Sequence, residues 1–317
     1  MLNLIDLVDN EEKTLTLDEL KEAKLHNVWL DLKDPSDEEV RALAEKVDIS
    51  KNLIKPTELP TFSSIRYVEN MAIFYFSSFS GEFDLKELST IAIIFSKTFI
   101  VTVRIGDMPA LDKAKQRLRK AETDSPSYVL YVLLDEIIGN YFSYVELIDD
   151  KVSHLEEAVI EKPAEGLFKE IIETKSKLTT FSRFLWYERS VLYVLKRSAL
   201  PFITDMTKSY LDELVDDLTK QIDSVTIFRE ILTDAMNFYR AALTQQSNER
   251  IEKLSDIVKV LTALTVIMAI PASISSHYGQ NFPIPEIKSV EFYYLTTVVT
   301  VGLILFVIFI FKKKGWI

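Results

Sequence analysis

Two long uncharged segments near the C-terminus constrain this chain more than any other feature of its sequence. Residues 260–276 carry no charge over 17 positions, and residues 292–311 carry none over 20 positions. A helix needs roughly 20 apolar residues to cross a bilayer core of ~30 Å, within a range of ~17–25. A buried core helix is the alternative for the first, more polar segment, but its neighbour follows after only 15 residues. The sequence therefore predicts two membrane spans, both in the last quarter of the chain.

Basic residues near the spans predict their orientation. Three lysines at 312–314 directly follow the second span, and three basic residues between positions 250 and 259 precede the first. The loop between the spans contains one lysine, Lys288, and the acidic N-terminus lacks the pattern of a signal peptide. Because Lys and Arg are enriched on the cytoplasmic side, both termini are predicted to be cytoplasmic in a multi-pass protein of the plasma membrane. Membrane lipid is then a partner, mainly of the second, more apolar span.

The composition excludes several other classes of function. The chain has no cysteine, so disulfides and thiolate sites are excluded, and its net charge of -11 argues against a nucleic-acid partner. The three histidines, His26, His154 and His277, form no cluster with ligand spacing. No nucleophile-and-base pattern and no nucleotide-binding loop is visible, so neither an enzyme nor an organic cofactor is predicted.

The first 125 residues are predicted to form an α/β domain. Ser36 and Glu39 form a capping box that starts a helix through Val47, and Pro109 opens an amphipathic helix that ends near Glu122. Runs of β-branched and aromatic residues predict strands. These strands are expected at 27–32, 71–79, 88–95 and 98–104.

The rest of the soluble part is predicted to be helical. A helix at 127–161 is expected to be interrupted by Pro163 and Gly166, and a second to follow at 167–197. Residues 202–270 contain neither proline nor glycine, and apolar residues recur there at spacings of three and four. At 1.5 Å per residue this predicts a stalk helix of roughly 100 Å that runs into the first span. Two spans cannot enclose a pore, so a pore would lie on the symmetry axis of an oligomer.

These elements give a predicted division of the chain into seven parts. They are a cytoplasmic α/β domain (1–125), a helical hairpin (126–200), the stalk helix (201–256), a first span that lines the pore (257–277), an outer loop (278–291), a second span (292–311) and a basic cytoplasmic tail (312–317).

One face of the first span is free of charge and rich in small and hydroxylic side chains. Such a stripe suits a pore lining, although small residues also mark ordinary helix packing in membranes. Its apolar members at the cytoplasmic end could form a constriction that gates by dewetting. The predicted pore-lining residues are Ser255, Val258, Leu261, Thr262, Thr265, Ala269, Ala272 and Ser276.

The outer end of the first span carries the sequence Tyr278-Gly279-Gln280-Asn281, followed by Ile-Pro-Glu-Ile with Glu286. Here the chain resembles the CorA family of magnesium channels, which has Tyr-Gly-Met-Asn at this place and a short acidic loop after it. The resemblance extends over the whole chain, including the Trp29-Leu30-Asp31 strand and the basic tail. It implies a funnel-shaped homopentamer that takes up Mg2+, with Co2+ and Ni2+ as further ions. Gln280 replaces the family's methionine, which puts the ion preference in question.

The four residues of the motif are the predicted selectivity filter, with Glu286 as an acid of the outer loop. Mg2+ gives up its water reluctantly, so a filter can select the hydrated ion. A ring of Asn281 amide oxygens would accept hydrogen bonds from those waters without a fixed charge that traps the ion. Gly279 would let the backbone turn and expose its carbonyl. The alternative for Asn281 is a helix C-cap beside Gly279.

The resemblance also implies a regulatory Mg2+ site between neighbouring cytoplasmic domains. The matching positions are Glu82 and Asp84 in a turn, with Glu213 and Asp217 on the stalk helix. Their i, i+4 spacing puts Glu213 and Asp217 on one face, where they could share a hydrated cation; a solvated acidic face is the alternative. A zinc transporter of the same superfamily and a non-conducting membrane-tethered scaffold or sensor remain as rival functions.

Overall fold

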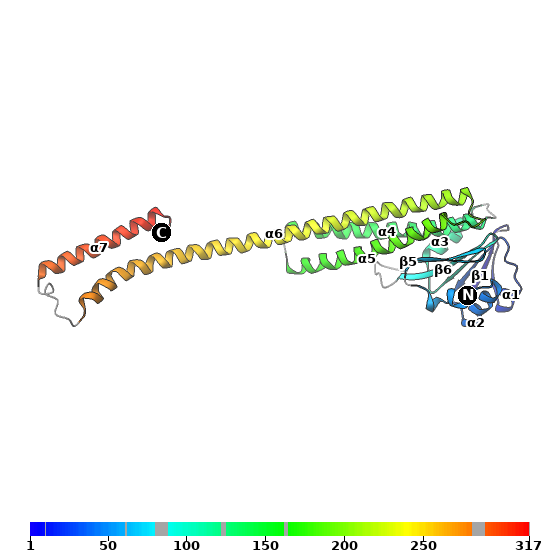
Figure 1. The fold of residues 1–317 in the computed structure, drawn as a ribbon, viewed down its shortest axis with the longest axis horizontal. Helices are drawn as coiled ribbons and strands as arrows, with labels where there is room; N and C mark the ends of the chain where they lie inside the picture. The colour runs from blue at the N-terminus through cyan, green and yellow to red at the C-terminus, as the bar shows by residue number, and fades with distance from the viewer. Residues whose placement is uncertain are drawn as a thin grey trace. The chain divides into compact units, whose positions relative to one another are not determined.

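The computed structural model describes residues 1–9, 11–60, 62–79, 88–121, 125–161, 164–280 and 289–316. The chain forms two compact units, Met1–Phe238 and Tyr239–Ile317, and the boundary between them falls inside helix α6 (Asp205–Tyr278) (Figure 1).

A mixed sheet with the spatial order β2-β1-β3-β7-β6-β5-β4 organises the first unit. Neighbouring strands are antiparallel, except that β3 and β7 run parallel, with Val28 opposite Phe99. The four predicted strands are confirmed as β3, β5, β6 and β7, whereas β1, β2 and β4 were not predicted. The strands are β1 (Leu2–Asp6), β2 (Glu12–Leu15), β3 (Val28–Lys33), β4 (Ser64–Val68), β5 (Met71–Phe79), β6 (Leu88–Phe95) and β7 (Phe99–Arg104).

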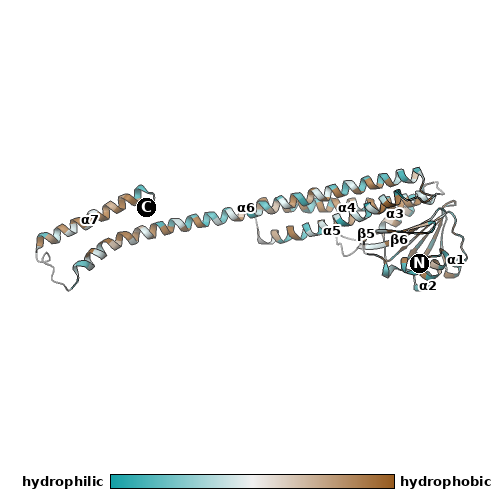
Figure 2. Ribbon diagram, viewed as in Figure 1, coloured by the Kyte–Doolittle hydropathy of each residue, from teal (hydrophilic) through white to brown (hydrophobic). Residues whose placement is uncertain are grey.

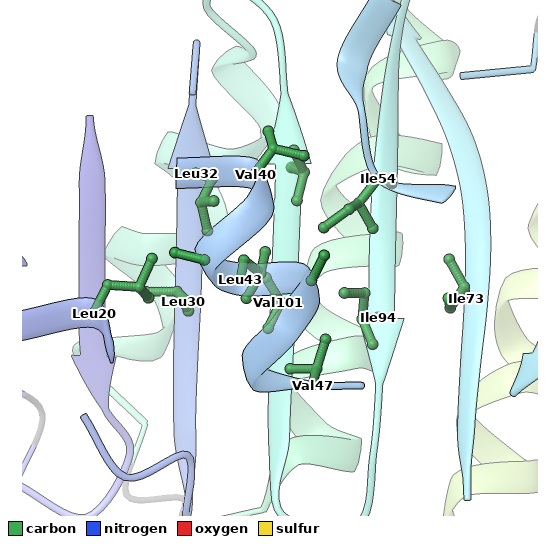
Figure 3. Close-up of a cluster of buried hydrophobic side chains, with 14 of the residues drawn as sticks. Leu20, Leu30, Leu32, Val40, Leu43, Val47, Ile54, Ile73, Ile94 and Val101 are labelled. Carbon is green, nitrogen blue, oxygen red and sulfur yellow. The ribbon is translucent and has the colours of Figure 1, made fainter. Parts of the chain in front are cut away.

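Two short helices, α1 (Leu17–Glu22) and α2 (Asp37–Lys46), cover one face of this sheet. The predicted capping box starts α2: the Ser36 amide donates to Glu39 Oε2 at 2.7 Å, and Ser36 Oγ accepts from the Glu39 amide at 3.3 Å. Side chains of both helices pack on every second residue of the central strands, as Figure 3 shows for Leu43 above Leu30 and Val101.

The other face is covered by α4 (Pro126–Glu161), which contacts β3, β5 and β7, and by α5 (Glu165–Lys196), which contacts β4 and β5; α3 (Pro109–Leu118) packs against α4. Successive strand residues point to opposite faces. The central strands are therefore buried on both sides, and they are continuous apolar runs for that reason. Two 3-10 turns, Lys51–Leu53 and Pro56–Glu58, lead from α2 into β4.

The hairpin of α4 and α5 corrects one detail of the sequence prediction. Gly166 does not interrupt the helices, because it lies in the first turn of α5. Glycine lowers helix stability through its backbone entropy, mainly in the helix interior, so it is tolerated in the first turn. Pro163, the other predicted break, falls outside the described residues. The first part of α6 packs on this hairpin, with buried Gln221 donating Nε2 to the Ile138 carbonyl at 3.0 Å.

The second unit contains the C-terminal part of α6 and helix α7 (Val290–Lys313). Both are long and apolar enough to cross a membrane, and their most apolar windows are 6% and 0% buried. Most of α7 is coloured brown, the hydrophobic end of the scale, in Figure 2. The helix ends in a glycine-capped turn: Gly315 has φ +67°, and the Trp316 amide donates to the Phe311 carbonyl at 3.0 Å.

Candidate functional site

All eight residues predicted to line a pore are exposed in the single chain. The partly covered side of the span holds Ala263, Ile267 and Ile274, and Ala263 is completely buried. Residues two positions apart differ by ~200° around a helix. Thr265, which follows Ala263 by two positions, and Ala269, which follows Ile267, therefore lie opposite that covered side. This part of the predicted stripe is left free for water, lipid or another copy of the chain.

Two hydroxyl groups of the stripe are held by their own helix. Thr262 Oγ1 donates to the Val258 carbonyl at 2.7 Å, and Thr265 Oγ1 donates to the Leu261 carbonyl at 2.8 Å. Each hydroxyl proton is used in this bond, so the oxygen lone pairs remain as acceptors on the exposed face. Acceptors of this kind suit the water shell of a cation, whose water molecules donate hydrogen bonds outward.

The sequence analysis did not predict a groove at the N-terminal end of the stripe. Ser255, Val258 and Thr262 line it together with Trp316, and its volume is about 300 Å³. The indole is held there by the glycine-capped end of α7 and stacks on Phe311 with ring centroids 5.4 Å apart. The signal was present as a Gly-Trp pair just after the three lysines.

The predicted filter motif is described only as far as Gln280. The Tyr278 ring packs 5.6 Å from the Phe292 ring of α7, and Gln280 is exposed. Gly279 continues the helical hydrogen bonds, with its amide donating to the Ser275 carbonyl at 2.9 Å. A Cβ at Gly279 would lie 3.0 Å from that carbonyl oxygen, so close approach is the structural reason for glycine here. The predicted filter residue Asn281 and the loop acid Glu286 lie outside the described residues.

A cavity of about 600 Å³ is lined by the C-terminal end of α6 and the N-terminal half of α7. Its lining includes Pro271, whose missing amide proton leaves the Ile267 carbonyl without an i+4 donor. Thr297 and Thr300 also line it, and both donate their hydroxyl protons to carbonyls of α7. Within the described residues, the walls therefore combine apolar side chains with hydroxyl groups, and those of Thr297 and Thr300 are already bonded.

The two stalk acids of the predicted regulatory site already have partners within the chain. Glu213 Oε2 accepts from the Tyr131 hydroxyl at 3.1 Å, and Asp217 Oδ1 accepts from Lys220 Nζ at 2.7 Å. Burial, the charge of Asp135 and the bond to Glu213 raise the pKa of Tyr131 to about 12, so this phenol stays a donor at neutral pH. Glu82 and Asp84 lie outside the described residues, and among the described ones no group of three acidic, His or Cys side chains could hold a metal.

A buried carboxyl on α5 was missed by the sequence analysis. Glu188 is completely buried, and its Oε1 accepts from the Ser77 amide at 3.1 Å, the Tyr141 hydroxyl at 2.9 Å and the Ser63 hydroxyl at 3.3 Å. Strand β4 begins at Ser64 opposite Tyr75, so the carboxyl occupies the place where a longer β4 would have bonded Ser77. Burial raises the pKa of Glu188 to about 8, although all three donors act to lower it.

The sequence did hold a signal for this carboxyl. Glu188 occupies the apolar stripe of α5, where it replaces a hydrophobic residue at helical spacing. The other members of that stripe are buried: Leu178, Phe181, Leu185, Leu192 and Leu195.

Comparison with known proteins shows which family the chain matches. A family model described as "CorA-like Mg2+ transporter protein" matches residues 24–313. The cobalt/magnesium transport protein CorA of Methanocaldococcus jannaschii is 26% identical over 316 residues, covering 95% of each chain. The complete structure of the CorA magnesium transporter from the same organism superimposes with a TM-score of 0.68 at 24% identity, covering 100% of this chain and 99% of that one. The cytoplasmic domain of ZntB from Vibrio parahaemolyticus gives a TM-score of 0.63 at 11% identity, covering 77% of this chain and 98% of that domain. At these identities the two structures establish the fold alone.

Proposed function

Because the chain belongs to the CorA-like Mg2+ transporter family, we propose that copies of it assemble around a common axis and conduct Mg2+ across the plasma membrane. The observation that carries this proposal is the uncharged stripe on α6, exposed on the side away from its partly covered face. Two spans enclose no pore, so the pathway lies on the symmetry axis. Five copies is the number that the family resemblance implies. Co2+ is a second candidate ion, since the archaeal relative is named for both metals.

The proposed filter is a ring of Asn281 side chains at the outer mouth, close to the Gly279 carbonyls. Mg2+ keeps several waters when bound, so amide oxygens that accept from those waters select it without stripping them. The hydroxyl oxygens of Thr262 and Thr265 continue the same kind of contact along the span. The driving force is the membrane potential, at ~2.3 kcal/mol per charge and 100 mV, or ~4.6 kcal/mol for a divalent ion. No enzymatic step and no organic cofactor form part of this mechanism.

Divalent flux into liposomes tests the channel and its filter together. The purified protein is reconstituted around a Mg2+-sensitive dye, and an inside-negative potential is applied. Asn281→Ala is compared with wild type and with Asn248→Ala, a matched change at an exposed position of α6 before the spans. Flux that only Asn281→Ala abolishes supports the proposal, whereas equal flux in all three proteins removes Asn281 from the filter. A protein that passes no ion under any potential or internal Mg2+ concentration is a membrane-tethered scaffold or sensor.

The second part of the proposal is closure of the pore by internal Mg2+. Glu213 and Asp217 would share a hydrated ion with Glu82 and Asp84 of a neighbouring copy, and carboxylates that repel each other across the interface would be drawn together by it. We expect Glu213→Gln with Asp217→Asn to weaken inhibition by internal Mg2+ at least several-fold. Lys220→Gln removes the cation beside Asp217 and should leave inhibition at least as strong. Unchanged inhibition in the double variant would overturn this assignment.

Zinc transport is the alternative that one observation favours, namely the likeness of the fold to the ZntB cytoplasmic domain. Gln280, which stands where the CorA family has methionine, is a second reason to consider zinc, because the change lies inside the filter motif. The same liposomes loaded with a Zn2+-sensitive dye separate the two ions. Faster entry of Zn2+ than of Mg2+ at equal concentration would reassign the transported ion and keep the architecture.

A further inference from the structure

The outer side of α5 and the adjacent edge strand β4 present aromatic and basic side chains together. Trp186 is 52% exposed, and the Phe62 ring lies 4.9 Å from the ring of Tyr187, next to Trp186 in the chain. Strand β4 is the last strand of the sheet, and the Tyr67 hydroxyl joins it to the Val194 carbonyl of α5 at 3.1 Å. We call this surface the basic–aromatic face; its central residues are Phe62, Arg183, Trp186, Tyr193 and Arg197.

The two arginines of this face are unpaired charges on an acidic protein. Arg183 and Arg197 are exposed, and neither forms an ion pair with any residue that the structure describes. The chain as a whole carries a net charge of -11. Arginine and the large aromatic residues are the types most enriched in the energetic centres of protein interfaces. A face of this composition suits a partner that offers carboxylates and apolar groups together.

The same chain offers such a surface on α6. Asp223, Ile227, Glu230, Asp234 and Phe238 follow one another at spacings of three and four, so they share one side of the helix. All five are exposed; Ile227 is 54% and Phe238 is 47% accessible to solvent. None of the three acids forms an ion pair with a described residue. This acidic–apolar face lies on the part of α6 that belongs to the first unit, and it begins after Glu213 and Asp217.

The two faces match in length as well as in charge. Arg183 to Arg197 spans ~21 Å of helix and Asp223 to Phe238 spans ~22 Å, at 1.5 Å per residue. Both remain open within one chain, because α5 and α6 touch through other residues. Arg189 donates to Thr219 Oγ1 at 3.1 Å, and Lys175 donates to Thr233 Oγ1 at 2.7 Å.

We propose that the basic–aromatic face of one copy docks on the acidic–apolar face of α6 in a second copy. Arginine pairs with carboxylates through two parallel hydrogen bonds, and the aromatic rings cover the exposed Ile227 and Phe238. Two different faces meet in this contact, so each copy can bind one neighbour on either side, and a ring closes when the last copy meets the first. The inference rests on the assembly contained in the proposed function and adds the residues that join neighbours.

Cysteine cross-linking in native membranes tests this contact, because the chain has no cysteine of its own. Tyr193→Cys with Ile227→Cys should give, with a short bis-maleimide, a ladder of covalent multimers. Either single variant, and the matched pair Leu147→Cys with Ile227→Cys, should stay monomeric; Leu147 is exposed on α4 outside both faces. Equal ladders in the matched pair, or no ladder in the test pair, would overturn the proposal.

Charge reversal makes the test specific and guards against misfolded variants. Arg183→Glu with Arg197→Glu should lower the cross-linking yield at least ten-fold, as should Asp223→Arg with Asp234→Arg. Joining all four changes in one chain should restore the yield, because every pair is then opposite in charge again. Lack of restoration overturns the proposal. Cross-links in a protein that conducts no ion would refute the channel and keep the interface, whereas flux without cross-links would refute the interface alone.

Discussion

The buried carboxyl of Glu188 gives the sharpest prediction for stability. We consider Glu188→Gln, which keeps the side chain's shape and an oxygen to accept from the Ser77 amide and the Tyr141 hydroxyl. The substitution removes the titratable proton and replaces one carboxyl oxygen with an amide NH2 group. In wild type this carboxyl has no cation beside it, and its Oε2 has no partner among the described residues. Its ionised form is therefore the unfavourable one inside the fold.

The direction and size of the effect follow from linkage between protonation and folding. Burial raises the pKa of Glu188 from 4.5 to about 8, so the folded state holds a proton that the unfolded chain releases above pH 4.5. Stability from this group is complete below pH 4.5 and is lost as the pH rises toward 8, by up to ~1.4 kcal/mol per pH unit. Between pH 6 and pH 8 the loss is roughly 2 kcal/mol, which lowers the melting temperature of a unit of this size by about 4–8 °C.

Melting curves of the full chain in detergent, followed by tryptophan fluorescence, measure this effect. Wild type and Glu188→Gln are compared at pH 6, 7 and 8, and the difference between them cancels every other titrating group. The wild-type protein should lose stability relative to the variant as the pH rises. Tyr141→Phe removes a donor to the carboxylate, which raises the pKa of Glu188 further and moves the loss to higher pH. Parallel curves for wild type and Glu188→Gln from pH 6 to 8 would refute the reasoning.

Two further substitutions follow from the geometry. Asp31→Asn leaves buried Arg104, now bonded to Asp31 at 3.0 Å, without its counter-charge, and should destabilise the first unit by about 3–5 kcal/mol in the same melting assay; a loss below 1 kcal/mol contradicts this. Gly279→Ala places a methyl group against a backbone carbonyl and should lower flux several-fold. Gly302→Ala, where a Cβ meets open space, is its control, and equal flux in the two variants would show that close approach at Gly279 is unimportant for conduction.

The sequence predicted those elements whose signals are local. The capping box of α2 and the four strands of apolar runs were predicted correctly because neighbouring residues determine them. The strands β2 and β4 were missed because they lie at the two edges of the sheet. Edge strands bury few side chains, so Glu12–Leu15 and Ser64–Val68 show little apolar periodicity. The parallel pairing of β3 with β7 joins segments about seventy residues apart in the chain, and no local pattern specifies it.

The difference between local signals and long-range contacts also explains which candidate sites the sequence could predict. The stripe on α6 could be predicted from spacing alone, since a helix fixes the relative directions of its side chains. Glu188 was missed because its environment comes from Tyr141 on α4 and Ser77 on β5, which are far from it in sequence. The Trp316 groove was missed for a similar reason, since it needs the end of α7 to lie beside α6.

The exposed surface of the second unit gives an independent argument for assembly. The apolar windows of α6 and α7 are almost unburied within one chain, although each contains about eighteen largely apolar residues. At ~25 cal/mol per Å² of apolar area, leaving such helices in water is far more costly than the few kcal/mol by which a domain is stable. Lipid can cover the apolar side chains of α7, and water can hydrate the exposed hydroxyl oxygens of Thr262 and Thr265. In the proposed assembly, a water-filled space between copies would hydrate the stripe while lipid covers the remainder.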